Sequence, residues 1–327
     1  MTVANSQETM PAKAPLSENV TWLLSRMTAL ATLIVALSFA SPYFFQTGNF
    51  VNILKQASFQ FLMSSGLTIV VLTAGIDLSI GAVLGLAACV GASFLANGQI
   101  FYGVGSALLV GFTCGLVNGS LIAYLRIPSF IATYGMLWIA VGLSFVFMDG
   151  QVIYGFPESF RVMGSGFIGP IPTPILIAAI LLIIMVITLN HTKLGRTLYA
   201  IGGNRNAARL SGMPVKFWEM MAYGISGLLA GFAGLVIIAR TGAVDAGVGN
   251  DLLLPTIAAV VLGGTSLMGG RGGIVGTAIG ALILAIILNG MNLLGVDTYW
   301  QIGVLGSVTV LAVLADDKIS KHIDMRG

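Results

Sequence analysis

The chain has 327 residues, of which 57% are hydrophobic and only 8% are charged, and its net charge is +3. A soluble domain carries about 25% charged residues, so the composition excludes a soluble domain and indicates an integral membrane protein. The small net charge gives no indication of nucleic-acid binding. We expect an all-α, polytopic membrane fold.

The first 21 residues are polar and are predicted to form a cytoplasmic tail. The apolar run that follows is longer than a signal-peptide core and has no convincing cleavage site, so we interpret it as a retained span. A membrane domain over 22–315 and a cytoplasmic tail over 316–327 complete the chain. About ten runs can cross a hydrocarbon core of about 30 Å, near residues 22–45, 58–75, 78–97, 100–125, 128–148, 173–190, 217–239, 252–268, 274–294 and 298–315.

The join between the second and third runs, at Gly75-Ile76-Asp77, is ambiguous. Residues 58–97 are too many for one span, yet two spans leave almost no turn between them. The join is therefore either a tight cytoplasmic turn or a break inside the membrane. In the first case the Asp77 side chain would cap the helix that begins at Leu78, together with Ser79.

The distribution of positive charge predicts the orientation. The positive-inside rule places most of the basic residues in the cytoplasm, namely Lys13, Arg26, Arg126, Lys193, Arg196, Arg205, Arg209, Lys216, Lys318, Lys321 and Arg326. Six spans before the loop 191–216 and four after it then place both termini in the cytoplasm. Segments 149–172 and 240–251 fall outside.

The loop 191–216 is the only sizeable basic stretch, and we predict that it docks a cytoplasmic partner. A short helix is expected from Asn204, which can cap it, to Gly212, which can take a left-handed exit before Pro214. Arg205 would lie at the positive end of the helix dipole, one turn from Arg209. An anionic partner would remove this conflict.

The sequence offers little catalytic chemistry. Its two cysteines and two histidines form no metal or disulfide pattern, and the glycine-rich stretch 263–273 lacks the lysine and hydroxyl residue of a phosphate loop. Asp77 is the only charged candidate deep in a span, so proton or sodium coupling is poorly supported. A protein without enzymatic activity of its own is indicated, and a stand-alone secondary transporter or channel remains the alternative.

Four motifs in order resemble the permease subunits of bacterial ribose-type ATP-binding-cassette sugar importers, within the branched-chain amino acid and ribose permease superfamily. The resemblance covers about Phe50 to Asp316. The motifs are Gly75-Ile76-Asp77-Leu78-Ser79-Ile80-Gly81, Gly195-Arg196-x-x-Tyr199-Ala200-Ile201-Gly202-Gly203-Asn204, Ala207-Ala208-Arg209-Leu210-Ser211-Gly212 and Gly263-Gly264-Thr265-Ser266-Leu267-x-Gly269-Gly270-Arg271-Gly272.

This resemblance implies a homodimeric permease of the bacterial inner membrane that admits a monosaccharide or polyol by alternating access. It implies a periplasmic sugar-binding protein and a separate cytoplasmic ATPase, which would bind the ATP and magnesium. Related docking helices carry Glu-Ala-Ala-x-x-x-Gly, and here Asn206 replaces the glutamate. Arg205 and Arg209 would then supply the charge contacts. The predicted coupling helix comprises Asn204, Arg205, Asn206, Ala207, Ala208, Arg209, Leu210, Ser211 and Gly212.

The substrate pathway is the least determined part of the prediction. At a membrane break, Asp77 could bond sugar hydroxyls or hold a gate, and Ser79 and Asn118 supply further polar groups. Tyr134 and Trp138 lie one helical turn apart and could stack on a sugar, although aromatic pairs at this spacing more often pack in a core. The sequence selects neither the sugar nor the resting conformation.

Overall fold

The computed structural model describes residues 16–324, and thirteen α-helices fill most of this part of the chain. The helices are α1 (Leu16–Ala40), α2 (Thr47–Leu72), α3 (Ile80–Leu95), α4 (Ile100–Ala123), α5 (Ser129–Met148), α6 (Glu158–Ser165), α7 (Thr173–His191), α8 (Lys193–Gly203), α9 (Arg205–Leu210), α10 (Val215–Thr241), α11 (Leu253–Leu262), α12 (Ile274–Leu293) and α13 (Thr298–Asp324). Four strands of two residues each and one 3-10 helix accompany them, β1 (Ile153–Tyr154), β2 (Phe167–Ile168), β3 (Ile171–Pro172), β4 (Ala243–Val244) and η1 (Asn250–Leu252).

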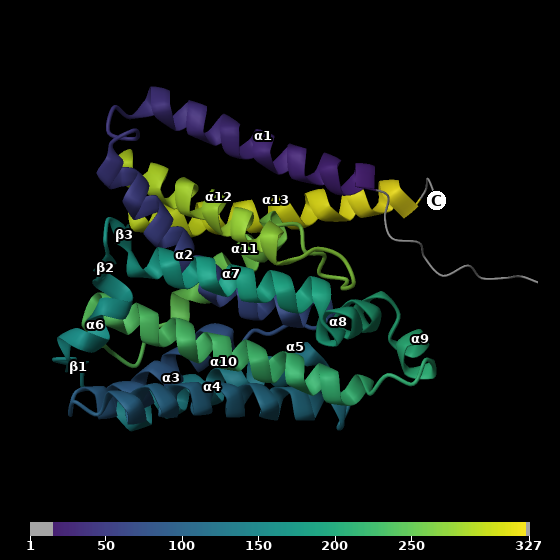
Figure 1. Cartoon of the computed structure of the whole chain (residues 1–327), viewed down its shortest axis with the longest axis horizontal. Coiled ribbons are helices and arrows are strands. Elements are labelled where there is room, and N and C mark those ends of the chain that lie inside the picture. Colours follow the sequence, from purple (N-terminus) through teal and green to yellow (C-terminus); the bar gives the residue numbers. More distant parts are fainter. Residues whose placement is uncertain (1–15, 325–327) are drawn as a thin grey trace, which may run out of the picture.

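The long helices run side by side along one axis (Figure 1). α10 packs against α2, α3 and α4, and α12 packs against α2 and α11. Within the described residues, α4, α5, α7, α10 and α12 are the helices long and apolar enough to cross a membrane on their own. These features establish a polytopic helical fold, as the composition predicts.

Glycine controls how closely the central helices approach. A Cβ atom on Gly111 of α4 would lie 2.2 Å from the Gly227 carbonyl oxygen of α10. A Cβ atom on Gly227 would lie 2.1 Å from the Gly111 carbonyl oxygen. No side chain fits between the two backbones. Small residues at such positions let membrane helices approach closely. Gly111 and Gly227 therefore allow α4 and α10 to pack closely.

Each of the ten predicted apolar runs coincides with a helix, but several of the expected bounds are wrong. α1 begins at Leu16 rather than near residue 22, and α13 extends to Asp324 rather than to residue 315, so parts of both predicted tails are helical. α11 ends at Leu262 rather than near residue 268, and its ten residues extend only about 15 Å, half of a hydrocarbon core. α3 has 16 residues and extends about 24 Å. α2 begins at Thr47 rather than near residue 58. α3 and α11 are short because glycine-containing loops replace part of each predicted span.

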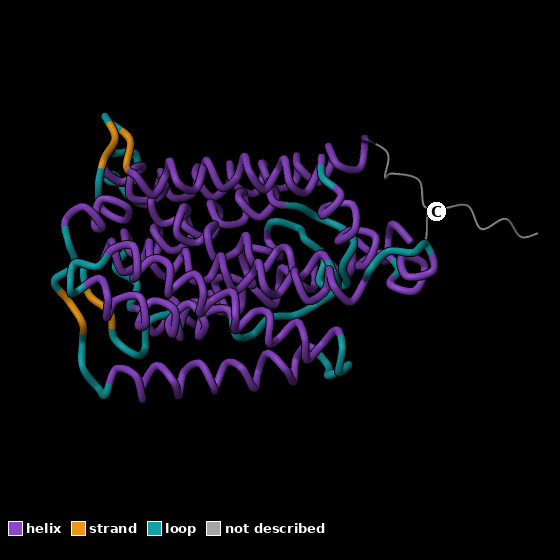
Figure 2. The backbone as a smooth tube through the Cα atoms, turned by 60° about the horizontal axis from the view of Figure 1, so that its bottom comes forward, coloured by secondary structure: helices purple, strands orange, loops and turns teal. Residues whose placement is uncertain are grey.

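The two predicted sides of the membrane correspond to the two ends of the bundle. Both strand pairs lie at one end (Figure 2), where β1 pairs with β4 and β2 pairs with β3. α8 and α9 lie at the other end, together with the described chain ends at Leu16 and Asp324 (Figure 1). Residues 1–15 and 325–327, which hold most of the predicted N-terminal tail and the last C-terminal residues, lie outside the described part.

Candidate functional site

The predicted coupling helix forms as α9, with the expected start and end. The Asn204 side-chain oxygen accepts hydrogen bonds from the backbone amides of Asn206 at 3.1 Å and Ala207 at 3.0 Å. Gly212 adopts a φ of +79°, the left-handed conformation that ends many helices. Pro214 follows and precedes α10. Local sequence therefore determines both boundaries of this helix.

The charge conflict at Arg205 is resolved inside the chain, which corrects the expectation of an external anion. Glu219 of α10 accepts two hydrogen bonds from the Arg205 guanidinium, one from Nε and one from Nη2 at 2.8 Å. These hydrogen bonds raise the pKa of Arg205 above its usual value, so the cation stays charged. The Arg205 side chain is half exposed, so the pair fixes the position of α9 more than it adds stability.

Ala208 faces the protein, which corrects the expectation that its small side chain fits a groove of a partner. It is 4% exposed and packs with Ile201 of α8 and Val215 of α10. The outward face of α9 instead presents Ala207, Arg209 and Leu210, and the Leu210 side chain is 83% exposed. An exposed leucine beside a free arginine is suited to contact with another protein.

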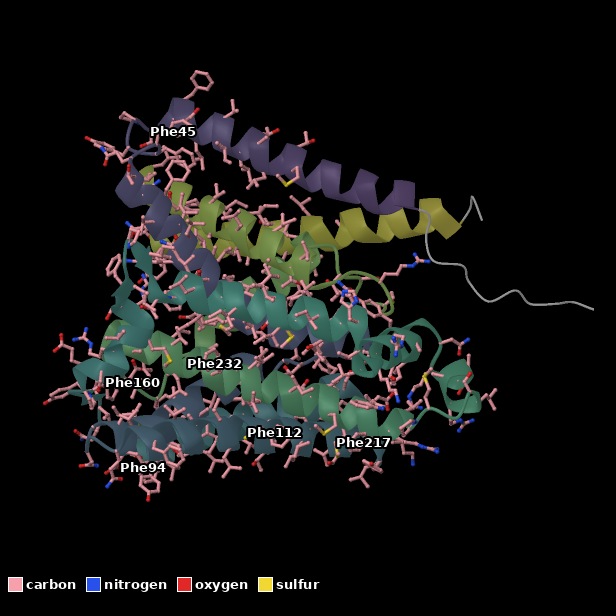
Figure 3. All side chains as sticks on the ribbon, viewed as in Figure 1. Phe45, Phe94, Phe112, Phe160, Phe217 and Phe232 are labelled. Carbon is pink, nitrogen blue, oxygen red and sulfur yellow. The ribbon has the colours of Figure 1, made fainter. Side chains whose placement is uncertain are left out.

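Polar side-chain atoms gather at the two ends of the bundle and carbon dominates between them (Figure 3). Phe217, in the first turn of α10, marks the end near α9, and Phe160 of α6 marks the opposite end. α9 protrudes beyond the long helices at its end (Figure 1). It is therefore placed where a water-soluble partner can reach it.

The ambiguous join is a break inside the bundle, formed by the loop 73–79 between α2 and α3. Asp77 is 2% exposed, and its Oδ2 accepts a hydrogen bond at 3.2 Å from Ser226 of α10. Ser226 lies about three turns, or about 16 Å, from the start of α10. The loop therefore reaches membrane depth, and a cytoplasmic turn at Asp77 is excluded.

Asp77, Ser79, Asn118 and Ser226 form one buried polar group, which we call the break cluster. Asp77 Oδ1 accepts from the Ser79 backbone amide at 3.0 Å and from the Ser79 hydroxyl at 2.7 Å. Asn118 Nδ2 donates to Ser79 Oγ at 2.9 Å. α3 begins at Ile80 rather than at Leu78, and the Ser79 side chain makes no capping hydrogen bond. The Asp77 carboxylate does accept from the Ser79 backbone amide, as the capping interpretation expects, and it also ties the loop to α10 through Ser226.

Tyr134 and Trp138 do not join the break cluster. Their rings meet edge to face with centroids 6.3 Å apart on an outward face of α5, where both side chains are about half exposed. Trp138 also borders a cavity of about 260 Å³ beside Leu78 and Asn250. Of the five predicted pathway residues, the structure thus brings together Asp77, Ser79 and Asn118 only.

Two of the four sequence motifs meet the end of α2 at a contact that the sequence did not predict, between Leu72, Gly202 and Gly270. We call this contact the junction. The Gly270 amide donates to the Leu72 carbonyl oxygen at 3.0 Å, and Tyr199 Oη donates to the Gly272 carbonyl at 2.9 Å. A Cβ atom on Gly202 would lie 1.9 Å from the Leu72 oxygen. The glycines in the motifs indicate that backbones approach closely there, but they do not indicate which segments come into contact.

The junction connects α8 with the end of α2 and with the loop between α11 and α12. Leu72 ends α2 and opens the loop to the break cluster, Gly202 lies in α8, and Gly270 lies in the loop between α11 and α12. Ile201 of α8 packs on Ala208 of α9. A displacement of α9 would therefore reach the end of α2 and the loop between α11 and α12 through packed neighbours.

Comparison with known proteins places the chain among permeases. Residues 49–313 match the family model described as the permease component of the branched-chain amino acid transport system. The chain is 43% identical to the ribose import permease RbsC of Escherichia coli (strain K12), over 91% of this chain and 95% of that protein. It is 39% identical to RbsC of Bacillus subtilis (strain 168), over 91% and 93% of the two chains. It is 37% identical to the D-allose permease AlsC of Escherichia coli (strain K12), over 89% and 90%.

Proposed function

The chain belongs to the family of branched-chain amino acid transport system permease components, and from its similarity to ribose and allose permeases we propose that it imports D-ribose or a closely related monosaccharide. It is the permease subunit of an ATP-binding-cassette sugar importer, a multi-pass protein of the bacterial inner membrane that works with a separate ATPase. The observation that carries the sugar assignment is similarity over nine-tenths of the chain to permeases named for ribose and allose.

We propose that the working unit is a homodimer with α9 docked on the ATPase and the opposite end facing a sugar-loaded binding protein. The exposed Arg209 and Leu210 of α9 support the docking site. The ion pair of Arg205 with Glu219 and the burial of Ala208 support a rigid connection from α9 to α8 and α10. ATP binding and hydrolysis would shift the population between two arrangements by moving α9.

The orientation of the chain can be tested with cysteine substitutions at opposite ends of the bundle. Cysteine at Glu158, which is exposed on α6, is expected to react with an impermeant thiol reagent added to intact cells that lack the outer-membrane barrier. Cysteine at Arg209 is expected to react only after the cells are opened. The native Cys89 is buried and Cys114 is half-buried, so both are replaced by serine first. Labelling of the Arg209 position alone in intact cells would reverse the orientation.

The function is tested by uptake of labelled D-ribose into proteoliposomes. We expect uptake only when the ATPase subunit, ATP and the sugar-binding protein are all present, because the permease motifs supply no nucleotide site. D-allose and D-galactose in the same assay measure selectivity. Accumulation without ATP would support the alternative of a stand-alone transporter. Absence of uptake of all three sugars by the complete system would contradict the sugar assignment.

A further inference from the structure

A second cavity of about 350 Å³ opens toward the end of the bundle opposite α9, and five polar and five apolar side chains line it. Its polar walls come from α2, α10, α12 and α13, and they are Gln56, Gln60, Arg240, Asn292 and Gln301. Polar side chains within membrane spans face a cavity or one another, because contact with lipid is costly. A cavity of this size suits a small ligand.

The amides of this cavity are only partly used by the protein. Gln301 is 8% exposed, and its Nε2 donates to Asn292 Oδ1 at 2.8 Å and to the Val296 carbonyl at 2.9 Å. Gln60 Nε2 contacts two hydroxyl groups at 3.3 and 3.5 Å. Among the described residues, the amide oxygens of Gln60 and Gln301 accept no hydrogen bond, and the Gln56 side chain makes none. Acceptors therefore remain for a ligand that carries hydroxyl groups.

Four of the five polar side chains that line the cavity are uncharged amides, and the fifth is the Arg240 cation. The Arg240 guanidinium lies over the Phe59 ring, with its central carbon 4.8 Å from the ring centroid. This cation–π contact fixes the arginine against the wall. Amides that both donate and accept match the hydroxyl groups of a sugar, each of which also does both.

The floor of the cavity continues as a closed polar stripe along α2. Gln56, Gln60, Ser64 and Thr68 are spaced four residues apart and share one face of the helix. Ser64 and Thr68 are fully buried, and the Thr68 hydroxyl lies 2.8 Å from the Thr277 hydroxyl of α12. The cavity is thus open at the outer end and closed toward the junction.

We propose that this cavity is a binding subsite for a neutral monosaccharide that has left the binding protein, with Gln56, Gln60 and Gln301 as its hydroxyl-binding residues. The assignment rests on the proposed function, and it adds the place of first contact with the sugar. Methionine is nearly isosteric with glutamine but lacks the amide, so Gln56→Met and Gln60→Met remove hydrogen bonds without opening a void. Gln46→Met, at an exposed position before α2, makes the same chemical change outside the cavity.

The test measures D-ribose uptake and ATP hydrolysis in the same proteoliposomes, with the wild-type complex shown to transport first. We expect each cavity variant to lower uptake about tenfold, as the loss of one or two hydrogen bonds would. Stimulation of ATP hydrolysis by the loaded binding protein should stay within about twofold of wild type, as should both readouts for Gln46→Met.

Two outcomes would overturn the subsite. Wild-type uptake in both cavity variants would show that the amides do not bind the sugar. An equal fall in uptake and in stimulated ATP hydrolysis would assign them to helix packing, since misfolding affects both readouts. If Gln60→Met inserts poorly, Gln56→Met decides alone, because the Gln56 side chain makes no hydrogen bond within the described protein. Failure of the wild-type complex to transport would instead contradict the proposed function.

Discussion

Replacement of Gly202 by alanine is expected to lower sugar uptake strongly while the protein still inserts into the membrane. The added Cβ atom would lie 1.9 Å from the Leu72 carbonyl oxygen and 2.4 Å from the Gly270 amide nitrogen. Both neighbours are backbone atoms that cannot rotate away, so α8 must move off α2 and the hydrogen bond between Gly270 and Leu72 is lost. Overpacking of this kind costs about 1–3 kcal/mol. We expect uptake and its stimulation by loaded binding protein to fall about tenfold or more.

The adjacent Gly203 provides a matched control. It also lies in α8, but a Cβ atom there would meet nothing within 4 Å. Gly203→Ala should therefore retain wild-type uptake. The measurement is uptake and ATP hydrolysis by the reconstituted complex, normalised to the permease present in the membrane. If Gly202→Ala and Gly203→Ala behave alike, the junction does not transmit motion from the coupling segment.

The double substitution Arg209→Glu with Leu210→Asp is expected to separate the permease from its ATPase. Both side chains are exposed on α9, so the changes alter the proposed docking surface without disturbing internal contacts. Burial of Leu210 in an interface would contribute about 1.5–3 kcal/mol, and the charge reversal adds repulsion from any anionic site. We expect at least about tenfold less ATPase to co-purify, with uptake lost in proportion.

Arg196→Glu, an exposed charge reversal on α8, is the control for a general effect of negative charge in this loop. Ala208→Trp is not suitable, because Ala208 is buried against Ile201 and Val215 and the large ring would disrupt the fold of the segment. Arg205→Glu is unsuitable as well, since it would face Glu219. Wild-type co-purification and uptake by the double variant would exclude α9 as the docking element.

The predicted coupling helix, α9, shows what can be predicted from neighbouring residues alone. Asn204 at its start and Gly212 at its end specify the two boundaries, because capping and a left-handed exit depend on residues within one turn. The sequence predicts an anionic partner for Arg205 outside the chain, whereas the structure pairs it with Glu219, which lies only 14 residues later in an apolar run. A single sequence gives no angle between α9 and α10, so this contact could not be predicted.

The sequence by itself determined that the protein is a polytopic helical membrane protein, and it located ten helices and the exposed basic segment. Hydropathy is sufficient for this, since each residue's preference for lipid or water is a property of its own side chain. Only the tertiary structure decided that Asp77 lies at a break within the bundle and that Leu72, Gly202 and Gly270 meet. It also gathered Gln56 and Gln301 around one cavity from opposite ends of the chain. Such contacts depend on how helices pack in three dimensions. The hydropathy of a sequence does not specify the distance between two helices.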